Sequence, residues 1–499
     1  MKIIGREIKS RKWDKETLFR FLAIIGGVLF FAHELNIAIF VRIFTLFKIE
    51  NSIAVTITSF IPIILSVPLL TKRYRKLKIF YIIYLAIFLY FLVSILLNLE
   101  SLEYYIRPKY GIHRVFFPSG GIFSIYYILL LYDKDNKSDI LVLFILSALA
   151  IFAIGSLQFI AAKYRGYWVF ENMKGNIGKL SYSLDFGFGM AFAINLFLGM
   201  AFIRNKNSYM ALALMGYYMI ITDGNRMSIV LPVAVTLLFI IYFSVNGFIN
   251  KLDLKKDLIK AVLILMSLII VFAMTFIFRQ LGITWIPALA IILTLFLLFF
   301  AVVRIVEKFN SKKNIVKSIV VITLLAVVVS SVFLLKQKQA SNNEKRNNLK
   351  TKTRTIEMLS SGNIFYDNAR KEIHGLVWSG LKNHPIIGLG AFGDRPLVAP
   401  KYIWGHSHGI HMELWSNLGL LFGLPFIIYL VNTFFVILFK NKNFDTIMYF
   451  VFVGTASLHL TSLSFWIEYY IWGLIAFSIL SMNRNDYWIA KIFGNKVKE

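Results

Sequence analysis

The chain contains no cysteine and few charged residues for its length. Asp, Glu, Lys and Arg make up 16% of its 499 residues, whereas soluble domains carry about 25%. The absence of cysteine excludes disulfide bonds, thiolate nucleophiles and metal sites with thiolate ligands. The scarcity of charge is typical of a protein that lies largely within a membrane.

In place of charge the sequence has long apolar blocks. Hydrophobic residues account for 58% of the chain, and its mean hydropathy is +0.69. Because roughly 20 apolar residues cross a bilayer as a helix, we expect an all-α polytopic integral membrane protein with about 12–14 transmembrane helices. The segment 36–48 either extends the first span or lies in the membrane interface. The predicted spans are residues 18–35, 53–71, 79–97, 119–132, 140–162, 182–203, 208–223, 227–246, 261–279, 283–303, 318–335, 412–439, 445–463 and 467–482.

Basic residues collect in the short loops on one side of this topology. If the N-terminus is cytoplasmic, every short basic loop is cytoplasmic as well, as the positive-inside rule requires. We therefore expect both termini in the cytoplasm and the segments between the basic loops outside it. The basic loops are residues 72–78, 133–139, 204–207, 250–260, 304–314 and 440–443.

This topology divides the chain into three regions. They are a transmembrane region at 1–335, a large extracytoplasmic loop at 336–411, and C-terminal transmembrane helices with a cytoplasmic tail at 412–499. The large loop carries an excess of Lys and Arg, and long loops escape the positive-inside rule. We interpret the excess as an attraction for an anionic partner at the outer leaflet. Nucleic acid is not expected as a partner, because these charges face away from the cytoplasm.

A short helix is predicted within the large loop. Residues 337–355 are polar and without period, but apolar residues then recur at helical spacing at Ile373, Leu376, Val377 and Leu381. A preceding Asp or Asn caps this helix, and a proline ends it. A second face is formed by residues four positions apart, namely Arg370, His374 and Trp378.

Five of the eight histidines lie within residues 374–411. They are His374, His384, His406, His408 and His411. A neutral imidazole accepts a proton from a hydroxyl group near neutral pH, and nearby arginines keep it neutral. The alternatives are a zinc site that includes Glu413, and histidines that only cap the following helix. The spacing matches no closed zinc pattern, and a basic loop disfavours a divalent cation. We therefore expect an acid–base site and no metal.

Two arginines and one basic-aromatic patch are candidate anion-binding groups. Arg226 interrupts two apolar blocks, and a charge near the bilayer core is costly enough to mark a functional cavity. The alternative is a turn in which Asp223 and Arg226 pair. Arg370 opens the predicted loop helix, and a guanidinium donates paired hydrogen bonds to phosphate. Lys163 and Arg165 lie among Tyr and Trp residues, as either an interface belt or a sugar-stacking surface.

Three segments resemble motifs of the O-antigen ligase and polymerase superfamily of bacterial envelope glycan enzymes. TDGNRMSIV at 222–230 is similar to a Ser-Arg-Gly-type turn, with Asn225 in the serine position. RKEIHGLVWSGLKNHPIIGLGAFG at 370–393 has an Arg, then a Trp, then a Pro followed by Gly-x-Gly. HSHGIHMELWSNLGLLFG at 406–423 leads into a span, with Gly409 where the family has asparagine.

The resemblance extends over residues 160–430 and implies a GT-C-like fold and a reaction. The family transfers glycans from undecaprenyl-pyrophosphate carriers at the outer face of the cytoplasmic membrane. It inverts the anomeric centre and needs neither a metal nor another cofactor. By resemblance, Arg226 and Arg370 stabilise the departing pyrophosphate, and His408 activates the acceptor hydroxyl.

Around these catalytic residues we expect a second group that binds the substrates. His406 orients His408 or binds the acceptor, while His411 and Glu413 lie on the helix that forms the cavity wall. The predicted substrate-binding residues are His374, Trp378, Lys163, Arg165, His406, His411 and Glu413.

We expect a polymerase that joins undecaprenyl-pyrophosphate-linked repeat units into capsular, exopolysaccharide or O-antigen chains. The alternatives are a ligase that moves a finished glycan to another acceptor, and a flippase or transporter for lipid-linked sugars. A transporter predicts internal repeats and charges near mid-span, whereas the polar residues here gather outside. The expected partners are the lipid-linked donor and acceptor glycans and the bilayer, with a flippase and a chain-length regulator as further candidates.

Overall fold

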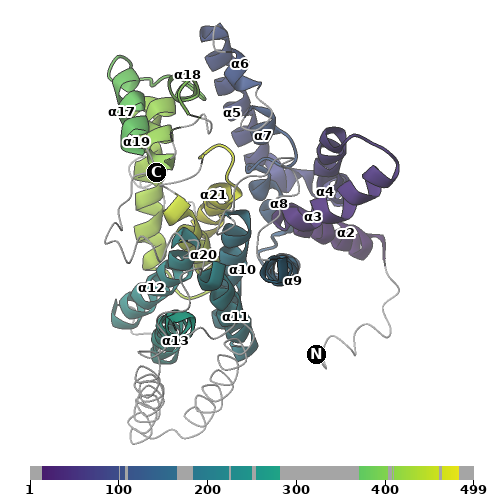
Figure 1. Cartoon of the computed structure of the whole chain (residues 1–499), viewed down its shortest axis with the longest axis vertical. Coiled ribbons are helices and arrows are strands. Elements are labelled where there is room, and N and C mark those ends of the chain that lie inside the picture. Colours follow the sequence, from purple (N-terminus) through teal and green to yellow (C-terminus); the bar gives the residue numbers. More distant parts are fainter. Residues whose placement is uncertain are drawn as a thin grey trace, which may run out of the picture. The chain divides into compact units, whose positions relative to one another are not determined.

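The computed structural model describes residues 14–99, 102–106, 111–165, 184–223, 226–249, 254–280, 370–402, 407, 409–459 and 464–482. All regular secondary structure in these ranges is helical (Figure 1). Because many of the helices are long and apolar, the chain is an all-α, polytopic membrane protein.

Six helices of the described ranges are long and apolar enough to cross a membrane. The count becomes seven if a bent pair of helices near the N-terminus forms one span. The six are Ile53–Leu97, Ser138–Tyr164, Phe186–Ile203, Ser228–Phe248, Lys256–Thr275 and Ile410–Leu438. They lie where spans were predicted, but the predicted spans 283–303 and 318–335 lie outside the described residues.

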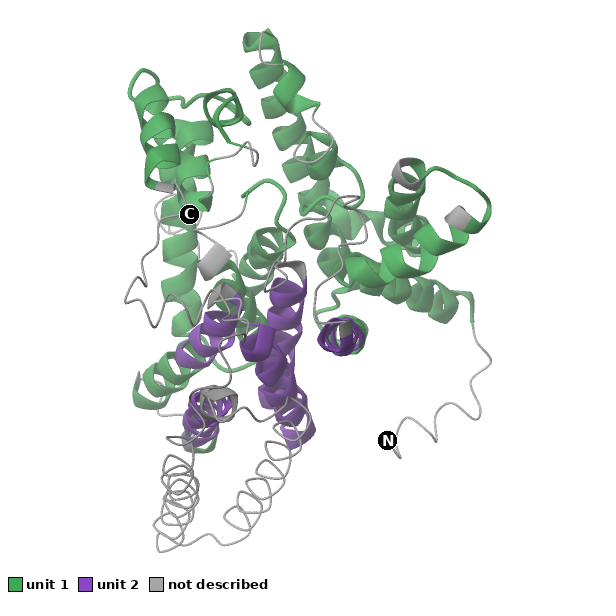
Figure 2. Cartoon of the chain, in the orientation of Figure 1, with its two compact units in different colours: residues 1–154, 238–258, 365–499 green, residues 155–237, 259–364 purple. Residues whose placement is uncertain are grey.

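The chain divides into two compact units (Figure 2). Unit 1 comprises residues 1–154, 238–258 and 365–499, and unit 2 comprises residues 155–237 and 259–364. Unit 2 contains α10 (Leu184–Ile203), α11 (Asn207–Asp223), most of α13 (Lys255–Gln280), the end of α9 (Ser138–Arg165) and the start of α12 (Arg226–Ile249). Unit 1 contains the rest of α9 and α12, together with α2 (Lys15–Phe31), α3 (His33–Leu46), α4 (Asn51–Arg73), η1 (Tyr74–Leu77), α5 (Lys78–Leu97), α6 (Leu102–Tyr105), α7 (His113–Phe116), α8 (Phe123–Leu131), α17 (Arg370–Leu381), α18 (Arg395–Val398), α19 (Ile410–Leu438), α20 (Phe444–His459) and α21 (Tyr469–Ser481).

The structure differs from the predicted topology at α8. A span was predicted at 119–132, but α8 has only 9 residues, all of them buried. At 1.5 Å per residue its length is about 14 Å, which is less than half the roughly 30 Å thickness of the hydrocarbon region. An apolar run predicts that its side chains are buried, whether by lipid or by protein. The side chains of α8 are buried by neighbouring helices.

A second difference concerns the basic stretch 72–78, which was predicted as a loop between two spans. In the structure α4, η1 and α5 follow one another directly, and Ile53–Leu97 forms one apolar helical stretch of 45 residues. The stretch KRYRKLK contains neither Gly nor Pro, and Lys, Arg and Leu are good helix formers. The backbone therefore stays helical through it, as the end of α4, the 3₁₀ helix η1 and the start of α5.

Ion pairs in unit 1 link basic segments that the topology predicts on one side of the membrane. Lys76 contacts Asp133 at 3.5 Å, and Lys137 contacts Asp445 at 3.1 Å. A third pair joins Lys442 to Asp257 at 2.7 Å. These contacts join the stretch 72–78 to the segment 133–139, that segment to the first turn of α20, and the segment 440–443 to the first turn of α13. The side of the membrane on which these segments lie stays a prediction.

Candidate functional site

The predicted loop helix exists as α17 and packs against α18 and α19 (Figure 1). Ile373 and Val377 of its apolar face are fully buried and form a small core with Val398 of α18. Tyr402 and Met412 pack against this core from either side of the histidine-rich segment. The apolar periodicity of the sequence therefore predicted the buried face of α17 correctly.

The connection after α17 inserts into a break in α19. At Gly419 the backbone of α19 leaves the helical conformation, with φ 60° and ψ −167°. Two main-chain N–H groups beyond the break, those of Leu420 and Leu421, donate to the carbonyls of Pro385 and Ile386 at 3.0 and 2.8 Å. In return the N–H of Leu389 donates to the carbonyl of Ser416 at 2.6 Å. The connection thus satisfies backbone groups that the kink leaves without helical partners.

Two glycines make this insertion sterically possible. Gly388 has φ +73° and Gly419 has φ +60°, both in the left-handed region that favours glycine. A Cβ on Gly388 would lie 2.6 Å from the nitrogen of Gly419, and a Cβ on Gly419 would lie 2.3 Å from the nitrogen of Gly388. The Gly-x-Gly segment of one motif and the Asn-Leu-Gly segment of another are therefore two halves of one junction.

Asn417 is the centre of the polar network around this junction. Its side-chain oxygen accepts hydrogen bonds from the N–H of Phe392 at 2.7 Å and from the indole Nε1 of Trp466 at 2.8 Å. Its side-chain nitrogen donates to Oδ1 of Asp394 at 3.3 Å. The other oxygen of Asp394 accepts from the main-chain N–H of Ser407 at 2.7 Å. One buried amide thus connects α19, the inserted connection and the histidine-rich segment.

A buried ion pair lies beside Asn417. Nη2 of Arg395 is 3.0 Å from Oε1 of Glu413, and neither side chain is more than 2% exposed. Ser464 accepts from Arg395 at 3.2 Å and donates to Glu413 at 2.8 Å, and the N–H of Phe465 donates to the other oxygen of Glu413. The guanidinium also lies over the ring of Phe392, at 4.4 Å from its centroid. These contacts give the buried carboxylate the partners that burial requires.

The end of α5 anchors the same network. Ser94 accepts a hydrogen bond from the N–H of Ala391 at 2.9 Å, and the hydroxyl of Tyr90 donates to the carbonyl of Asn417. The ring of Phe91 lies between two other aromatic rings, with its centroid 5.0 Å from those of Phe392 and Trp466. The inserted connection is therefore held by α5 as well as by α19.

We call the junction at Gly388 and Gly419, with the polar network of Asp394, Arg395, Glu413, Asn417, Ser464 and Trp466, the scaffold. Two of the predicted histidines contact each other beside it. The rings of His374 on α17 and His411 on α19 lie edge to face, with centroids 5.4 Å apart. A Cβ on the buried Gly409 would lie 3.0 Å from Cε1 of His411 and 3.3 Å from Nε2 of His374. A side chain at position 409 would therefore make close contacts with both imidazoles. This is a steric reason for glycine at a position where the family that the sequence resembles has asparagine.

For the other predicted site residues, the structure describes only part of the chain or only the backbone. His406 and His408 lie outside the described residues, and the side chains of Arg226, Arg370 and Arg165 are not described. Arg370 is the first residue of α17, Arg226 the first of α12, and Arg165 the last of α9. Arg226 belongs to unit 2 and Arg370 to unit 1. Their predicted catalytic roles, and the alternative pairing of Arg226 with Asp223, stay untested.

Three predicted substrate-binding residues differ in their exposure. The indole of Trp378 is 53% exposed on α17. Lys163 donates to the carbonyl of Thr222 at 3.4 Å within unit 2. Glu413 is buried, and its two oxygens accept hydrogen bonds from the chain itself. Its direct contact with a substrate stays a prediction, whereas its structural role follows from these bonds.

Sequence reasoning missed the residues that build the scaffold. Asp394, Arg395, Ser464 and Trp466 carry no local motif of their own, and Asn417 lies within the motif at 406–423 but was given no role. The available signal was Asn417, a polar residue near the start of a long apolar block, because polar groups at such positions usually have a specific partner. The partners of Asn417 are distant in sequence. The sequence could therefore have indicated that Asn417 has a structural role, but not which residues it contacts.

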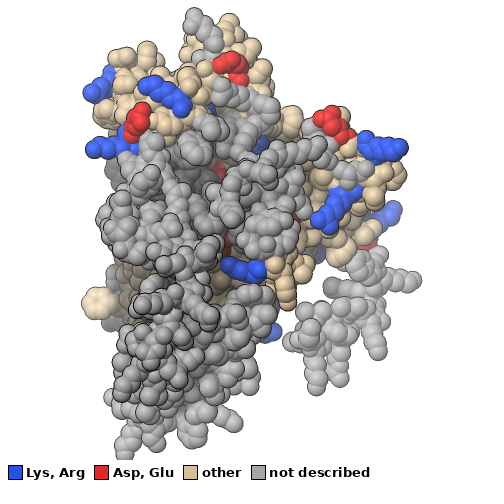
Figure 3. Space-filling view, viewed as in Figure 1, with Lys and Arg blue, Asp and Glu red and all other residues tan. Residues whose placement is uncertain are grey.

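Exposed cations surround this region of unit 1. Lys371, Lys382 and Lys401 are exposed, and Figure 3 shows basic side chains over the part that holds α17 and α18. Among the described residues no group of three His, Cys, Asp or Glu side chains is arranged to hold a metal ion. The surface near the two imidazoles is therefore cationic, which suits an anionic substrate.

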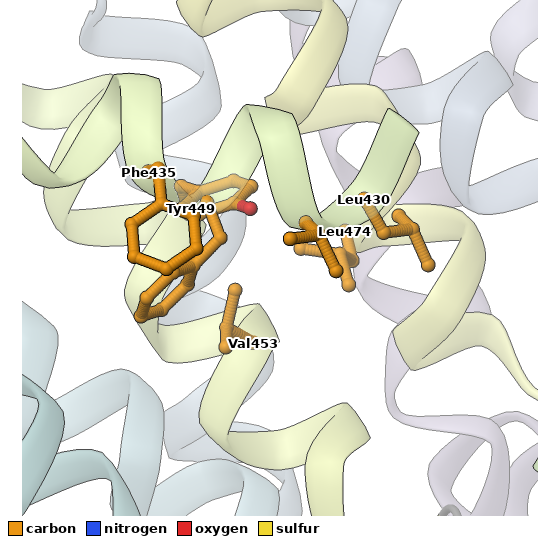
Figure 4. A pocket seen from close by; sticks show the side chains of 7 residues that line it. Leu430, Phe435, Tyr449, Val453 and Leu474 are labelled. Carbon is orange, nitrogen blue, oxygen red and sulfur yellow. The ribbon is translucent and has the colours of Figure 1, made fainter. Parts of the chain in front are cut away.

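A separate apolar pocket lies among α19, α20 and α21, and Figure 4 shows the side chains around it. Its volume is about 250 Å³, and almost all of its lining surface is apolar. The lining residues are Leu430, Val431, Phe434, Phe435, Tyr449, Val453 and Leu474. The pocket offers space for hydrocarbon but no constellation of polar groups for catalysis.

Comparison with known proteins identifies no relative: no protein-family model, no curated protein and no solved structure matches the chain.

Proposed function

We propose that the chain is a glycosyltransferase of the bacterial cytoplasmic membrane that polymerises undecaprenyl-pyrophosphate-linked oligosaccharide repeat units at the outer face. The observation that supports this most directly is the junction between the connection after α17 and the kink of α19. The two segments that resemble the O-antigen ligase and polymerase superfamily interlock there through backbone hydrogen bonds. Two of their histidines, His374 and His411, meet beside the junction.

In the proposed reaction, a hydroxyl oxygen of the acceptor glycan attacks the anomeric carbon of the donor glycan. The bond between that carbon and the phosphate oxygen breaks, and undecaprenyl pyrophosphate leaves with the bonding electrons. The hydroxyl proton passes to His408, while Arg226 and Arg370 stabilise the charge on the pyrophosphate. Attack from the face opposite the leaving group inverts the anomeric centre, and no step needs a metal.

The contacts of the two residues next to His408 in the sequence support this assignment. Ser407 and Gly409 flank His408 in the sequence. The N–H of Ser407 is bonded to Asp394, and Gly409 is buried against His374 and His411. Positioned groups contribute strongly to transfer between two bulky substrates, because orientation is established before the chemical step. The exposed lysines near α17 add attraction for the diphosphate carriers.

Substitution of the proposed catalytic residues tests this assignment in cells. His408→Ala should abolish long polymer while the protein remains in the membrane. His384→Ala is the matched control, because His384 is an exposed histidine of the same loop. Arg226→Lys and Arg370→Lys should also fail, since lysine lacks the paired donors of a guanidinium. Normal polymer lengths in the His408→Ala strain would contradict the assignment of His408 as the general base.

The lipid-linked pool in a deletion strain separates the polymerase from the two alternatives. Loss of a polymerase leaves single repeat units on the carrier at the outer face. Loss of a ligase leaves long unligated chains, and loss of a flippase removes both species from the outer face. We expect single repeat units.

A further inference from the structure

The first two helices of the chain meet at a sharp bend. α2 and α3 are bent by 99° at Ala32. α2 has 17 residues, which reaches the lower end of the range of about 17–25 that crosses the hydrocarbon region. If α2 crosses the bilayer near its normal, a bend of this size directs α3 along the membrane plane.

Contacts with α4 fix the orientation of α3. The buried side chain of Asn36 donates a hydrogen bond from Nδ2 to the carbonyl of Thr58 at 3.1 Å. Farther along, Ile37, Val41 and Phe44 share one face, because they are spaced by four and then three residues. All three are partly buried. The opposite face of α3 is consequently the one that no described helix covers fully.

That opposite face is apolar and open. Ile39, Ile43 and Leu46 are again spaced by four and then three residues, and they are 40%, 41% and 82% exposed. Phe47, immediately after the helix, is 74% exposed. Arg42 lies in the same stripe and is exposed. The open face thus combines large apolar side chains with one cation.

An apolar stripe that also contains an arginine is unfavourable both in water and in the hydrocarbon core of a bilayer. Water would leave a contiguous apolar stripe hydrated. The bilayer core would bury the guanidinium of Arg42 at high cost. At the interface both groups are satisfied, because apolar side chains enter the acyl region while a long basic side chain reaches the phosphate groups. Lys48, which is also exposed, follows the stripe at the end of α3.

We propose that α3 is an interfacial helix that docks on the lipid surface, parallel to the membrane plane. Ile39, Ile43, Leu46 and Phe47 enter the upper acyl region, and Arg42 and Lys48 lie at the height of the lipid phosphates. Its partner is a phospholipid surface. This assignment does not depend on the glycosyltransferase activity proposed above.

The cysteine-free chain allows a direct test with single-cysteine variants. Ile39→Cys, Ile43→Cys and Leu46→Cys would each carry a spin label, in nanodiscs of phosphatidylethanolamine and phosphatidylglycerol. The depth of each label follows from its collision rates with oxygen and with a water-soluble nickel chelate. Cysteines at Ile82, Leu89 and Leu96, which are exposed along α5, provide the comparison for a helix that crosses the membrane.

We expect the three α3 labels at one shared depth just below the phosphates. The α5 labels should instead differ by about 10 Å for every seven residues. A comparable change in depth between positions 39 and 46 would overturn the proposal in favour of a crossing helix. Nickel accessibility equal to that of a label at Asp135, in an exposed loop, would overturn it in favour of a helix in water. Phe47→Cys supplies a replacement position if one variant does not fold.

Discussion

At the scale of single residues, the ion pair between Arg395 and Glu413 is the most demanding interaction of the scaffold. Withdrawing two charges from water is favourable only when their remaining donors and acceptors also find partners. Ser464 and the N–H of Phe465 supply those partners for the carboxylate. The pair therefore makes the position of α18 strongly dependent on α19.

We expect Glu413→Ala to reduce the free energy of unfolding by about 3–5 kcal/mol, because it leaves the Arg395 charge buried without its counterion. Thermal unfolding in detergent measures the loss. The double variant Arg395→Leu/Glu413→Leu should recover much of it, since no charge then remains buried. Asp135→Ala, in an exposed loop, should change stability by less than about 0.5 kcal/mol. Equal stability of Glu413→Ala and the parent chain would contradict this role.

Tyr402 provides a pH-dependent contact between α17 and the segment after α18. Its hydroxyl is hydrogen-bonded to Glu372, and this bond raises the pKa of Tyr402 to about 12. Because the folded pKa is above the ordinary value of about 10, the contribution is complete below pH 10 and is lost as pH rises through 12. Tyr402→Phe should remove this alkaline loss of stability. Identical pH profiles for the variant and the parent would contradict the assignment.

The partners of Glu413 show why residue contacts were only partly predictable. The histidine-rich sequence around it favoured a role in substrate binding. Its structural partners Arg395 and Ser464 lie 18 and 51 positions away, so no periodicity or motif could join them. The polar residues themselves were visible in the sequence, but their pairing depends on how separate segments fold together.

At the scale of secondary-structure elements, the junction at Gly388 and Gly419 determines the path of the loop. The inserted connection and the kinked helix exchange main-chain hydrogen bonds, so neither element is complete without the other. A kink in a helix has an identifiable cause. Here the cause is a glycine in a non-helical conformation with another backbone packed against it.

We expect Gly419→Ala and Gly388→Ala to destabilise the protein and to shorten or abolish its polymer product. The left-handed conformation alone costs about 1–3 kcal/mol for a residue with a side chain, and the added Cβ would overlap the facing backbone. Polymer length and thermal unfolding measure the two effects.

Two glycines offer matched controls for this prediction. A Cβ on Gly423, on the same helix, has its nearest neighbour at 3.6 Å, and a Cβ on Gly375 of α17 has none within 4 Å. Gly375→Ala should stabilise α17 by about 0.5–1 kcal/mol. If Gly423→Ala were as harmful as Gly419→Ala, the specific packing argument would fail.

Elements with a clear local pattern were predictable, and those decided by neighbours were not. The buried face of α17 followed from the spacing of Ile373 and Val377. The length of α8 did not, because a short apolar run looks the same whether lipid or protein surrounds it. The helical path through 72–78, which includes the 3₁₀ helix Tyr74–Leu77, was missed because positive charge indicates which side a segment occupies but not whether its backbone forms a loop.

At the scale of the whole molecule, charge distribution and ion pairs agree on how unit 1 is organised. Of the six basic segments that the positive-inside rule grouped together, four regions in unit 1 are linked by ion pairs of Lys76, Lys137 and Lys442. At the end of α5 opposite the basic stretch 72–78, Ser94 instead bonds to Ala391 of the inserted connection, and Tyr90 bonds to Asn417 of α19. The inserted connection and the basic stretch 72–78 thus lie at different ends of α5, and the location of the proposed site at the outer face stays a prediction.

Polymerisation by the purified chain tests the central proposal most directly. The protein would be reconstituted in liposomes with undecaprenyl-pyrophosphate-linked repeat units, in the presence of a metal chelator. We predict glycans of increasing length, release of undecaprenyl pyrophosphate, an inverted linkage in the product, and no product with His408→Ala. A folded protein that forms no glycosidic bond, or one whose activity the chelator abolishes, would contradict the proposed metal-independent polymerase.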